Sequence, residues 1–269
     1  MSAPSLAPRR GVSIAILAVV GTLFALPLLA MLEFSLRTEN GHGFVHWTGL
    51  FDPENAFRYR PLFTGITESL ILCIVAVIVV LALLLPTMLL VRLRFPRLRR
   101  VLELICLIPI AVPAIALVVG LAPVYGVVVR VLGSGGWTLG LVYGVLVLPF
   151  ASRALESAMQ AVDLRTLVEA ARSLGAGWLR VFGQILLPNL RRGILAAAFI
   201  SIAVVLGEYT VASLLNRENL QVAIVSISRT DPYVAVIFSL LALVFVACLL
   251  LAIGRIAAPR RRARSKGTR

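Results

Sequence analysis

The most telling spacing in this chain begins at Glu169-Ala170-Ala171, reaches Gly175 after three residues, and continues to Ile185 and Leu187-Pro188 after nine more. Helical periodicity, with a glycine where a left-handed residue can end a helix, predicts two short helices joined at an elbow. On the pattern alone, two interpretations stay open. The elbow is either a surface for a partner protein or an interfacial helix lying on lipid.

Local signals predict the bounds of these two helices. Thr166-Leu167-Val168-Glu169 fits a capping box, in which the threonine hydroxyl and the glutamate carboxylate satisfy each other's backbone amides. One apolar side is then expected from helical spacing, made by Leu167, Ala170, Ala171 and Leu174. A second short helix is expected over residues 178–187, and Pro188 should end it or begin the next helix.

Nucleotide chemistry is not expected in this chain. A P-loop needs a lysine behind a glycine-rich turn, and the only lysine is Lys266, with no Gly-x-x-x-x-Gly-Lys before it. Any ATP-driven step must therefore use a separate ATPase. We expect no catalytic residues, no cofactor and no metal in the chain itself.

One acid, Glu208, interrupts the apolar run 193–216. A carboxylate inside a bilayer costs about 2.5–3.5 kcal/mol on insertion scales, so it should face other helices or a wet cavity. Ser201 lies seven residues earlier on the same helical face, and Tyr209 adds a hydroxyl. These three residues either line a path for a cationic solute or belong to a helix-packing contact around the acid.

Other residues with ligand chemistry are explained more simply. His42 and His46 are spaced for a metal on a helix, but Gly41 and Gly43 disfavour a helix there. With Trp47, they are expected in a loop that touches the membrane surface or another protein. The three cysteines lie in apolar runs and should behave as small hydrophobes: Cys73, Cys106 and Cys248.

The surrounding elements are predicted to be membrane helices. The chain is 60% hydrophobic, with a mean hydropathy of +0.99. Four uncharged runs can each cross roughly 30 Å of hydrocarbon: 11–32, 69–91, 104–129 and 232–254. The run 137–152 should continue past Arg153, and 193–216 is a sixth. We therefore expect an all-α integral membrane protein with six spans.

Prolines mark two features of this layout. The third run contains Pro109, Pro113 and Pro123, so we expect one kinked helix packed inside the bundle, where neighbours can satisfy the freed carbonyls. Asp231-Pro232 is a helix cap followed by proline, which predicts the start of the last span.

The net charge of +14 is explained by membrane topology and does not indicate nucleic-acid binding. With the N-terminus inside, 20 of the 26 basic residues fall in cytoplasmic segments, and the others are Arg37, Arg58, Arg60, Arg130, Arg217 and Arg229. This asymmetry places both termini in the cytoplasm. The tail around Arg260-Arg261-Arg262 is expected to anchor on anionic lipid.

The spacing from Glu169 to Pro188 resembles, at every fixed position, the EAA signature of binding-protein-dependent ABC importer permeases. The resemblance implies a six-helix type I permease with a coupling loop over 153–193. It implies that small alanines let the elbow seat closely on the ATPase. The coupling residues would be Glu169, Ala170, Ala171, Gly175, Ile185, Leu187 and Pro188.

The same resemblance implies a domain layout and a set of partners. A cytoplasmic N-terminus over 1–10, a permease domain over 11–257 and a basic tail over 258–269 are expected, in a bacterial cytoplasmic membrane. The partners would be ABC ATPase subunits that bind the ATP, a second permease subunit (identical or similar), an external solute-binding protein and lipid. ATPase closure would move residues 169–175 as a lever.

The solute and one competing class stay open. Leu26-Pro27-Leu28-Leu29 resembles the spermidine/putrescine branch, so polyamines are the first expectation, with ferric iron, phosphonate or another small solute as alternatives. A stand-alone ion-coupled carrier would instead show paired intramembrane charges and inverted repeats. One acid and no evident repeat are present.

Overall fold

The computed structural model describes residues 10–39 and 41–257. The expected basic tail over 258–269, and the N-terminal segment up to residue 9, lie outside the described residues. Within them, six helices are long and apolar enough to cross a membrane, which confirms the all-helical, six-span prediction. They are Gly11–Ser35, Pro53–Arg94, Ala114–Leu132, Gly136–Gln160, Trp178–Leu206 and Pro232–Leu249.

The described chain divides into two compact units, one made of residues up to 60 with 224–244, the other of 61–223 with those from 245. The first unit contains α1 (Arg10–Ser35), the β1–β2 hairpin (Arg37–Thr38 with Gly41–His42) and α2 (Val45–Thr48). Two 3-10 turns follow, Gly49–Phe51 and Pro53–Asn55. The unit also holds the first turn of α3 (Ala56–Arg94) and half of α12 (Pro232–Ala257).

In the first unit, Asp231 caps α12 as the sequence predicts. Its Oδ1 accepts a hydrogen bond from the Val234 amide at 3.2 Å, and its Oδ2 accepts one from the Tyr59 hydroxyl at 2.8 Å. The two histidines have separate partners: His42 Nε2 lies 3.0 Å from Glu33 Oε1, and the His46 ring stacks on Tyr233 at 4.2 Å between centroids. The start of α12 is therefore held by side chains of α2 and of the first turn of α3.

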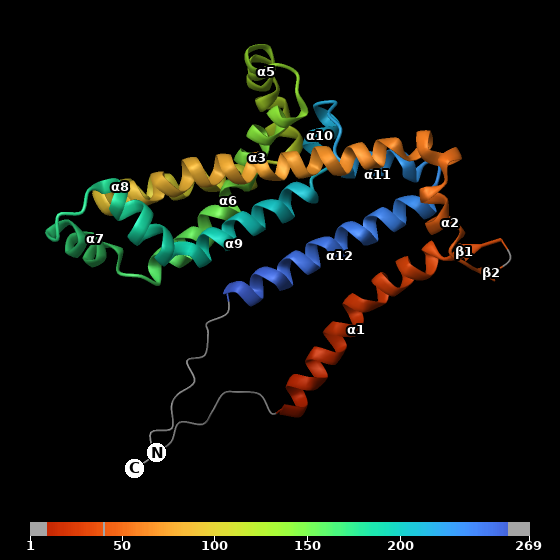
Figure 1. Cartoon of the computed structure of the whole chain (residues 1–269), viewed down its shortest axis with the longest axis horizontal. Coiled ribbons are helices and arrows are strands. Elements are labelled where there is room, and N and C mark those ends of the chain that lie inside the picture. The colour runs from red at the N-terminus through yellow and green to blue at the C-terminus, as the bar shows by residue number, and fades with distance from the viewer. Residues whose placement is uncertain (1–9, 40, 258–269) are drawn as a thin grey trace. The chain divides into compact units, whose positions relative to one another are not determined.

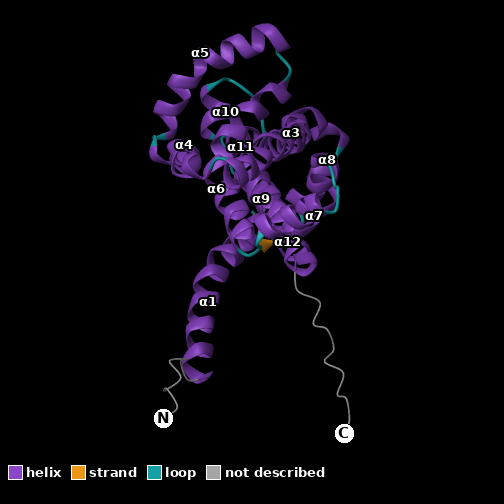
Figure 2. Ribbon diagram, turned by 90° about the vertical axis from the view of Figure 1, so that its left-hand side faces the viewer, coloured by secondary structure: helices purple, strands orange, loops and turns teal. Residues whose placement is uncertain are grey.

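The second unit is built around α6 (Leu139–Gln160) and α9 (Leu187–Leu206), which lie along each other in Figures 1 and 2. Gly193 of α9 lets the two backbones approach, because a Cβ there would overlap that of Ala158 on α6. The centre of this unit is fully buried and includes Tyr143, Val147, Leu155, Met159, Leu186 and Leu190.

The other elements of the second unit surround this pair. They are α3 from residue 61, the turn Pro96–Leu98, α4 (Arg99–Ala111), α5 (Ala114–Leu132), the turn Gly136–Thr138, α7 (Leu164–Ser173), α8 (Trp178–Arg180), α10 (Thr210–Leu214) and the start of α11 (Leu220–Ser228). In the view of Figure 2, α4 and α5 lie on one side of the α6–α9 pair, and α7 and α8 on the other.

The prediction of one kinked third span inside the bundle is wrong. Pro113 holds Val112 in an extended conformation (φ −96°, ψ 130°), so the chain forms two helices, α4 and α5, instead of one bent helix. Most of α5 is exposed in the isolated chain, where Val118 and Tyr125 are its buried residues. Proline therefore separates two helices here.

The prediction of a separate short helix over 178–187 is also wrong. Helix α8, a π-helical turn over Val181–Leu186 and α9 follow one another without a break, and Trp178–Leu206 is one span. Pro188 has no amide to donate to Gln184, which suits the wider π-helical turn before it. The Asn189 side chain donates to the Ile185 carbonyl at 2.7 Å, which gives that oxygen a partner.

Candidate functional site

The elbow, residues 163–180, begins with a cap that differs from the predicted capping box. Asp163 precedes α7, and its carboxylate accepts hydrogen bonds from the Thr166 amide (3.3 Å) and the Thr166 hydroxyl (2.7 Å). Glu169 instead pairs with Arg165 at 2.9 Å, one turn away on the exposed side of α7. The helix starts earlier than predicted because the shorter aspartate side chain reaches the first free amides.

The electrostatics of the elbow follow from these two contacts. Hydrogen bonds from Thr166 hold the pKa of the Asp163 carboxyl below its usual value. The hydrogen bond to Glu169 raises the pKa of the Arg165 guanidinium. The Arg165 and Glu169 side chains are 84% and 64% exposed, so their pairing contributes little to stability.

The buried face of α7 is not the one predicted from periodicity. Leu164, Val168 and Ala171 are buried against the second unit, whereas Leu174 is 89% exposed. Ala170 is also exposed, on the side of Glu169. Because Ala171 points inward, it lies with the core of its own chain and is not part of the exposed contact surface. In the isolated chain, Ala171 therefore differs from Glu169 and Ala170, which are exposed.

Gly175 makes the turn that the sequence predicts. Its φ is +82°, a left-handed conformation in which an added Cβ would be strained. The Gly175 amide donates to the Arg172 carbonyl at 3.0 Å, and the Ala176 amide donates to the Ala171 carbonyl at 3.1 Å. These two bonds form a Schellman motif, so the backbone closes the end of α7 by itself.

The corner of the elbow exposes apolar side chains that sequence reasoning did not single out as a surface. Leu179 is 91% exposed and Trp178 is 51% exposed, with the Arg172 guanidinium 5.4 Å from the Trp178 ring centre. Together with Leu174, they flank Gly175 on both sides. Large apolar residues next to a helix-ending glycine, in an otherwise charged segment, were the signal that could have found them.

The remaining signature residues connect this corner to the helices behind it. Ile185 and Leu187 are half-buried and pack against the hydrophobic core, and Pro188 is exposed. They hold α8 and the π-helical turn in line with α9. Glu169, Ala170 and Gly175 are thus exposed at the elbow, and the other signature residues support it. Figure 1 shows α7 and α8 at one end of the second unit.

Glu208 lies in a break between helices, not within a helix as predicted. Helix α9 ends at Leu206, and the Glu208 carboxylate caps α10: Oε1 accepts from the Val211 amide at 2.9 Å, and Oε2 accepts from the Ala212 amide at 3.4 Å. Gly207 interrupts the run where the sequence suggested an unbroken span. The carboxylate therefore has backbone donors at a position where it is half-buried.

Asn219 ties this break to two other helices through a contact that we name the Asn219 knot (Ser69, Tyr143, Glu208, Asn219). The Asn219 side chain is 1% exposed; its Nδ2 donates to the Tyr143 hydroxyl at 3.0 Å and to the Glu208 carbonyl at 2.6 Å. Its Oδ1 accepts from the Val222 amide at 2.9 Å, and Ser69 Oγ accepts from the Leu220 amide at 2.8 Å. Sequence reasoning missed this group, because its members are distant in the chain.

The structure separates the three predicted path residues. Ser201 is fully buried, and its hydroxyl donates to the Ala197 carbonyl of its own helix at 2.7 Å. Since α9 ends before Glu208, the shared helical face that linked Ser201 to the acid does not exist, and that prediction is wrong. Tyr209, 37% exposed, stays beside Glu208 at the break.

Arg217 makes a second set of contacts between the segment after α10 and the other helices. Its Nη1 donates to the Ser134 carbonyl at 2.9 Å, and its guanidinium lies 5.5 Å from the centre of the Tyr125 ring. The Tyr125 hydroxyl in turn lies 3.1 Å from Thr138 Oγ1. The segment 207–220 is thus connected to α3, α5 and α6 by named polar contacts.

Comparison with known proteins gives two findings. A family model described as binding-protein-dependent transport system inner membrane component matches residues 78–263, more than half of the chain and including the elbow. The spermidine/putrescine transport system permease protein PotB of Haemophilus influenzae is 41% identical over 78 residues. That match covers 29% of this chain and 26% of PotB, so the chain is matched to about a quarter of that relative's length.

Proposed function

Because this chain belongs to the family of binding-protein-dependent transport system inner membrane components, we propose that its elbow is the surface through which a separate ATPase drives it. The chain is a multi-pass inner-membrane permease and not itself an enzyme. In this proposal it pairs with a second permease subunit, identical or similar, and receives solute from an external binding protein. The permease domain extends over 11–257, with the coupling loop at 153–193.

The single observation that carries the proposal is the geometry of the elbow. Leu174 and Leu179 are almost fully exposed on either side of a left-handed glycine, at the end of two helices that run into the core. A monomer gains nothing from exposing two leucines there, whereas a partner with an apolar cleft would bury them. Glu169 and Ala170 add a charged and a small contact at the same corner.

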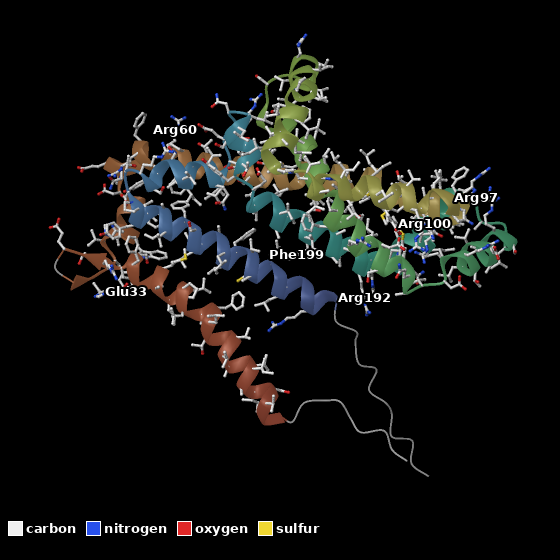
Figure 3. All side chains as sticks on the ribbon, turned by 180° about the vertical axis from the view of Figure 1, so that it is seen from behind. Glu33, Arg60, Arg97, Arg100, Arg192 and Phe199 are labelled. Carbon is white, nitrogen blue, oxygen red and sulfur yellow. The ribbon has the colours of Figure 1, made fainter. Side chains whose placement is uncertain are left out.

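The proposed orientation places the elbow in the cytoplasm. Four of the six spans precede the elbow or end at it, so it lies on the same side as the N-terminus. Arginines are concentrated on that side, at the end of α3 and the start of α4, and Figure 3 shows Arg97 and Arg100 at the same end of the second unit as the elbow. Their positive charge favours the cytoplasmic face. An even number of spans then puts both termini inside.

Polyamines are the proposed solutes. The partial likeness to PotB supports this class, and the acid at the break after α9 suits a cation. Glu208 has two carboxylate oxygens, each with one amide donor, and each keeps a lone pair for a passing ammonium group. Tyr209 adds a part-exposed hydroxyl beside it. Ferric iron, phosphonate or another small solute are the alternatives that transport assays would distinguish.

The coupling proposal is tested in proteoliposomes that contain the permease, with or without a candidate ATPase. Solute uptake should require the ATPase and its ATP hydrolysis. Single cysteines replacing Ala170 or Leu174, which are exposed, should crosslink to the ATPase, whereas a cysteine replacing Ala171, which is buried, should not. Uptake without the ATPase, driven by an ion gradient, would support the carrier class and contradict the proposal.

The pathway proposal has its own test. Glu208→Gln keeps an acceptor for the α10 cap but removes the negative charge. Uptake of spermidine or putrescine should fall, while assembly with the ATPase and its basal hydrolysis stay unchanged. Wild-type uptake in this variant would remove Glu208 from the pathway and leave it the role of a helix cap.

A further inference from the structure

A charged contact outside the elbow joins three helices of the second unit. Glu156, near the end of α6, accepts three hydrogen bonds on one carboxylate oxygen, Oε1. The donors are Arg92 Nη1 at 3.0 Å, Arg99 Nη2 at 2.7 Å and Gln160 Nε2 at 2.9 Å. We call the set of Glu156, Arg92 and Arg99 the Glu156 clamp.

The clamp differs from the other ion pairs of this unit in burial and in reach. The Glu156 side chain is 13% exposed and that of Arg92 is 26% exposed, and Arg92 and Glu156 are 64 residues apart in sequence. The other pairs described in the second unit, Arg99–Glu103 and Arg165–Glu169, connect residues one turn apart on exposed helices. Screened pairs of that kind contribute little, whereas a partly buried carboxylate with two guanidinium groups is costly to break.

The place of the clamp relates it to the elbow. Arg92 belongs to the last turn of α3, and Arg99 is the first residue of α4, so the clamp ties the α3–α4 turn to α6. Three residues after the end of α6, Asp163 caps α7. Arg92 also lines, with Asp163 and Arg165, a hollow of about 360 Å³ beside the start of the elbow.

We propose that Glu156 is a positioning residue that transfers displacement of the elbow to α3 and α4. This inference rests on the proposed coupling function, since it needs an ATPase that moves the elbow. Helix α6 is continuous over Leu139–Gln160, so its end moves as one body with Glu156. Through the two guanidinium groups, that movement carries the end of α3 and the start of α4 with it.

The physical reason is the balance of charge at the clamp. The Glu156 carboxylate holds two arginines that would otherwise repel each other across the α3–α4 turn. Without that negative charge, nothing at this position offsets the repulsion between the two arginines, and the turn is free to separate from α6. The elbow would then still receive the ATPase, but part of its motion would not reach α3 and α4.

The test compares Glu156→Gln with Glu103→Gln in permease assembled with its ATPase in proteoliposomes. Both variants remove one negative charge from a partner of Arg99, but Glu103 pairs within α4 and does not join helices. For Glu156→Gln, the number of solute molecules moved per ATP hydrolysed should fall roughly tenfold, within the range typical of a coupling free energy between sites. For Glu103→Gln, that ratio should stay at the wild-type value, and Glu156→Asp should restore part of it.

The outcomes separate this inference from a merely structural role. If Glu156→Gln lowers hydrolysis and uptake equally, so that their ratio is unchanged, or if Glu103→Gln lowers the ratio as much, the inference is overturned. Should Glu156→Gln fail to assemble, Arg92→Gln, which leaves Glu156 its bonds to Arg99 and Gln160, must lower the ratio, and an unchanged ratio overturns the inference. Uptake by the wild type that needs no ATPase would instead contradict the proposed function itself.

Discussion

Long helices end at two places in the second unit, at the elbow after α6 and at the break after α9. The free backbone groups find hydrogen-bond partners in opposite ways at these two places. At the elbow, main-chain bonds from Gly175 and Ala176 close the end of α7, and the side chains around them stay exposed. At the knot, buried side chains from α3, α6 and the segment before α11 provide the bonds. The elbow is locally encoded, whereas the knot exists only when distant segments meet.

Because of this difference, we expect substitutions at the elbow and at the Asn219 knot to affect different properties of the protein. At the elbow, main-chain hydrogen bonds close the end of the helix, so the side chains there are not needed to hold the turn. Substitutions of these side chains should therefore change ATPase contact more than stability. A break that depends on buried amide and hydroxyl groups does need its side chains, because each lost partner leaves a desolvated polar group. The Glu156 clamp stands between the two, as a side-chain contact that is partly buried and reaches toward the elbow.

The largest effect on stability is expected at the Asn219 knot, from Asn219→Ala. The change removes one hydrogen-bond partner from each of the Tyr143 hydroxyl, the Glu208 carbonyl and the Val222 amide. Loss of buried hydrogen bonds of this kind should lower the free energy of unfolding by about 1–3 kcal/mol. Thermal melting of the detergent-solubilised protein should show the loss.

The matched control for this prediction is Asn189→Ala. Asn189 is exposed, and its amide donates to a single carbonyl, that of Ile185. The melting temperature of this variant should therefore stay close to that of the wild type. Equal shifts for the two asparagines would mean that the knot is no more important to stability than a surface contact.

A smaller effect is expected at the elbow, from Gly175→Ala. The backbone there has φ +82°, which costs an alanine about 1–2 kcal/mol, although no atom lies within 4 Å of the added Cβ. The strain should alter the angle between α7 and α8, so ATPase-dependent uptake should fall more than the melting temperature. Gly177→Ala is the control, since Gly177 has φ −73° and the same open space. Equal uptake by both variants would contradict a conformational requirement at Gly175.

The sequence predicted well what depends on short-range pattern. Six spans, the continuation of the fourth past Arg153, the Asp231 cap and the left-handed Gly175 all follow from local composition or from one residue's backbone preference. The inward face of α7 was misassigned, because helical spacing tells which residues share a face but not which face packs against the rest of the unit.

What the sequence could not predict depends on contacts across the fold. The break at Gly207 turns Glu208 from a residue on a helical face into a cap for α10, and its backbone carbonyl accepts from Asn219, which also donates to Tyr143 of α6. The pattern around Pro113 suggested a kink, but whether a proline bends one helix or separates two depends on what packs against it. Nothing in the sequence distinguishes Glu156 from the other acids near arginines, because its pairing with Arg92 and Arg99 depends on how α3, α4 and α6 pack.

The smallest effect is expected from a change of pH, since the Asp163 cap of the elbow titrates and the amide of Asn219 does not. Hydrogen bonds from Thr166 lower the pKa of Asp163 below its unfolded value of about 3.9. A carboxyl with a lowered folded pKa contributes stability above its unfolded pKa and loses it as the pH falls through the folded pKa. Protection of the α7 amides in hydrogen exchange, corrected for intrinsic rates, should therefore be constant near neutral pH and decline below about pH 4. Asp163→Asn keeps a cap that does not titrate, so its α7 protection should lack this decline; the same decline in both proteins would mean that another group causes the acid sensitivity of the elbow.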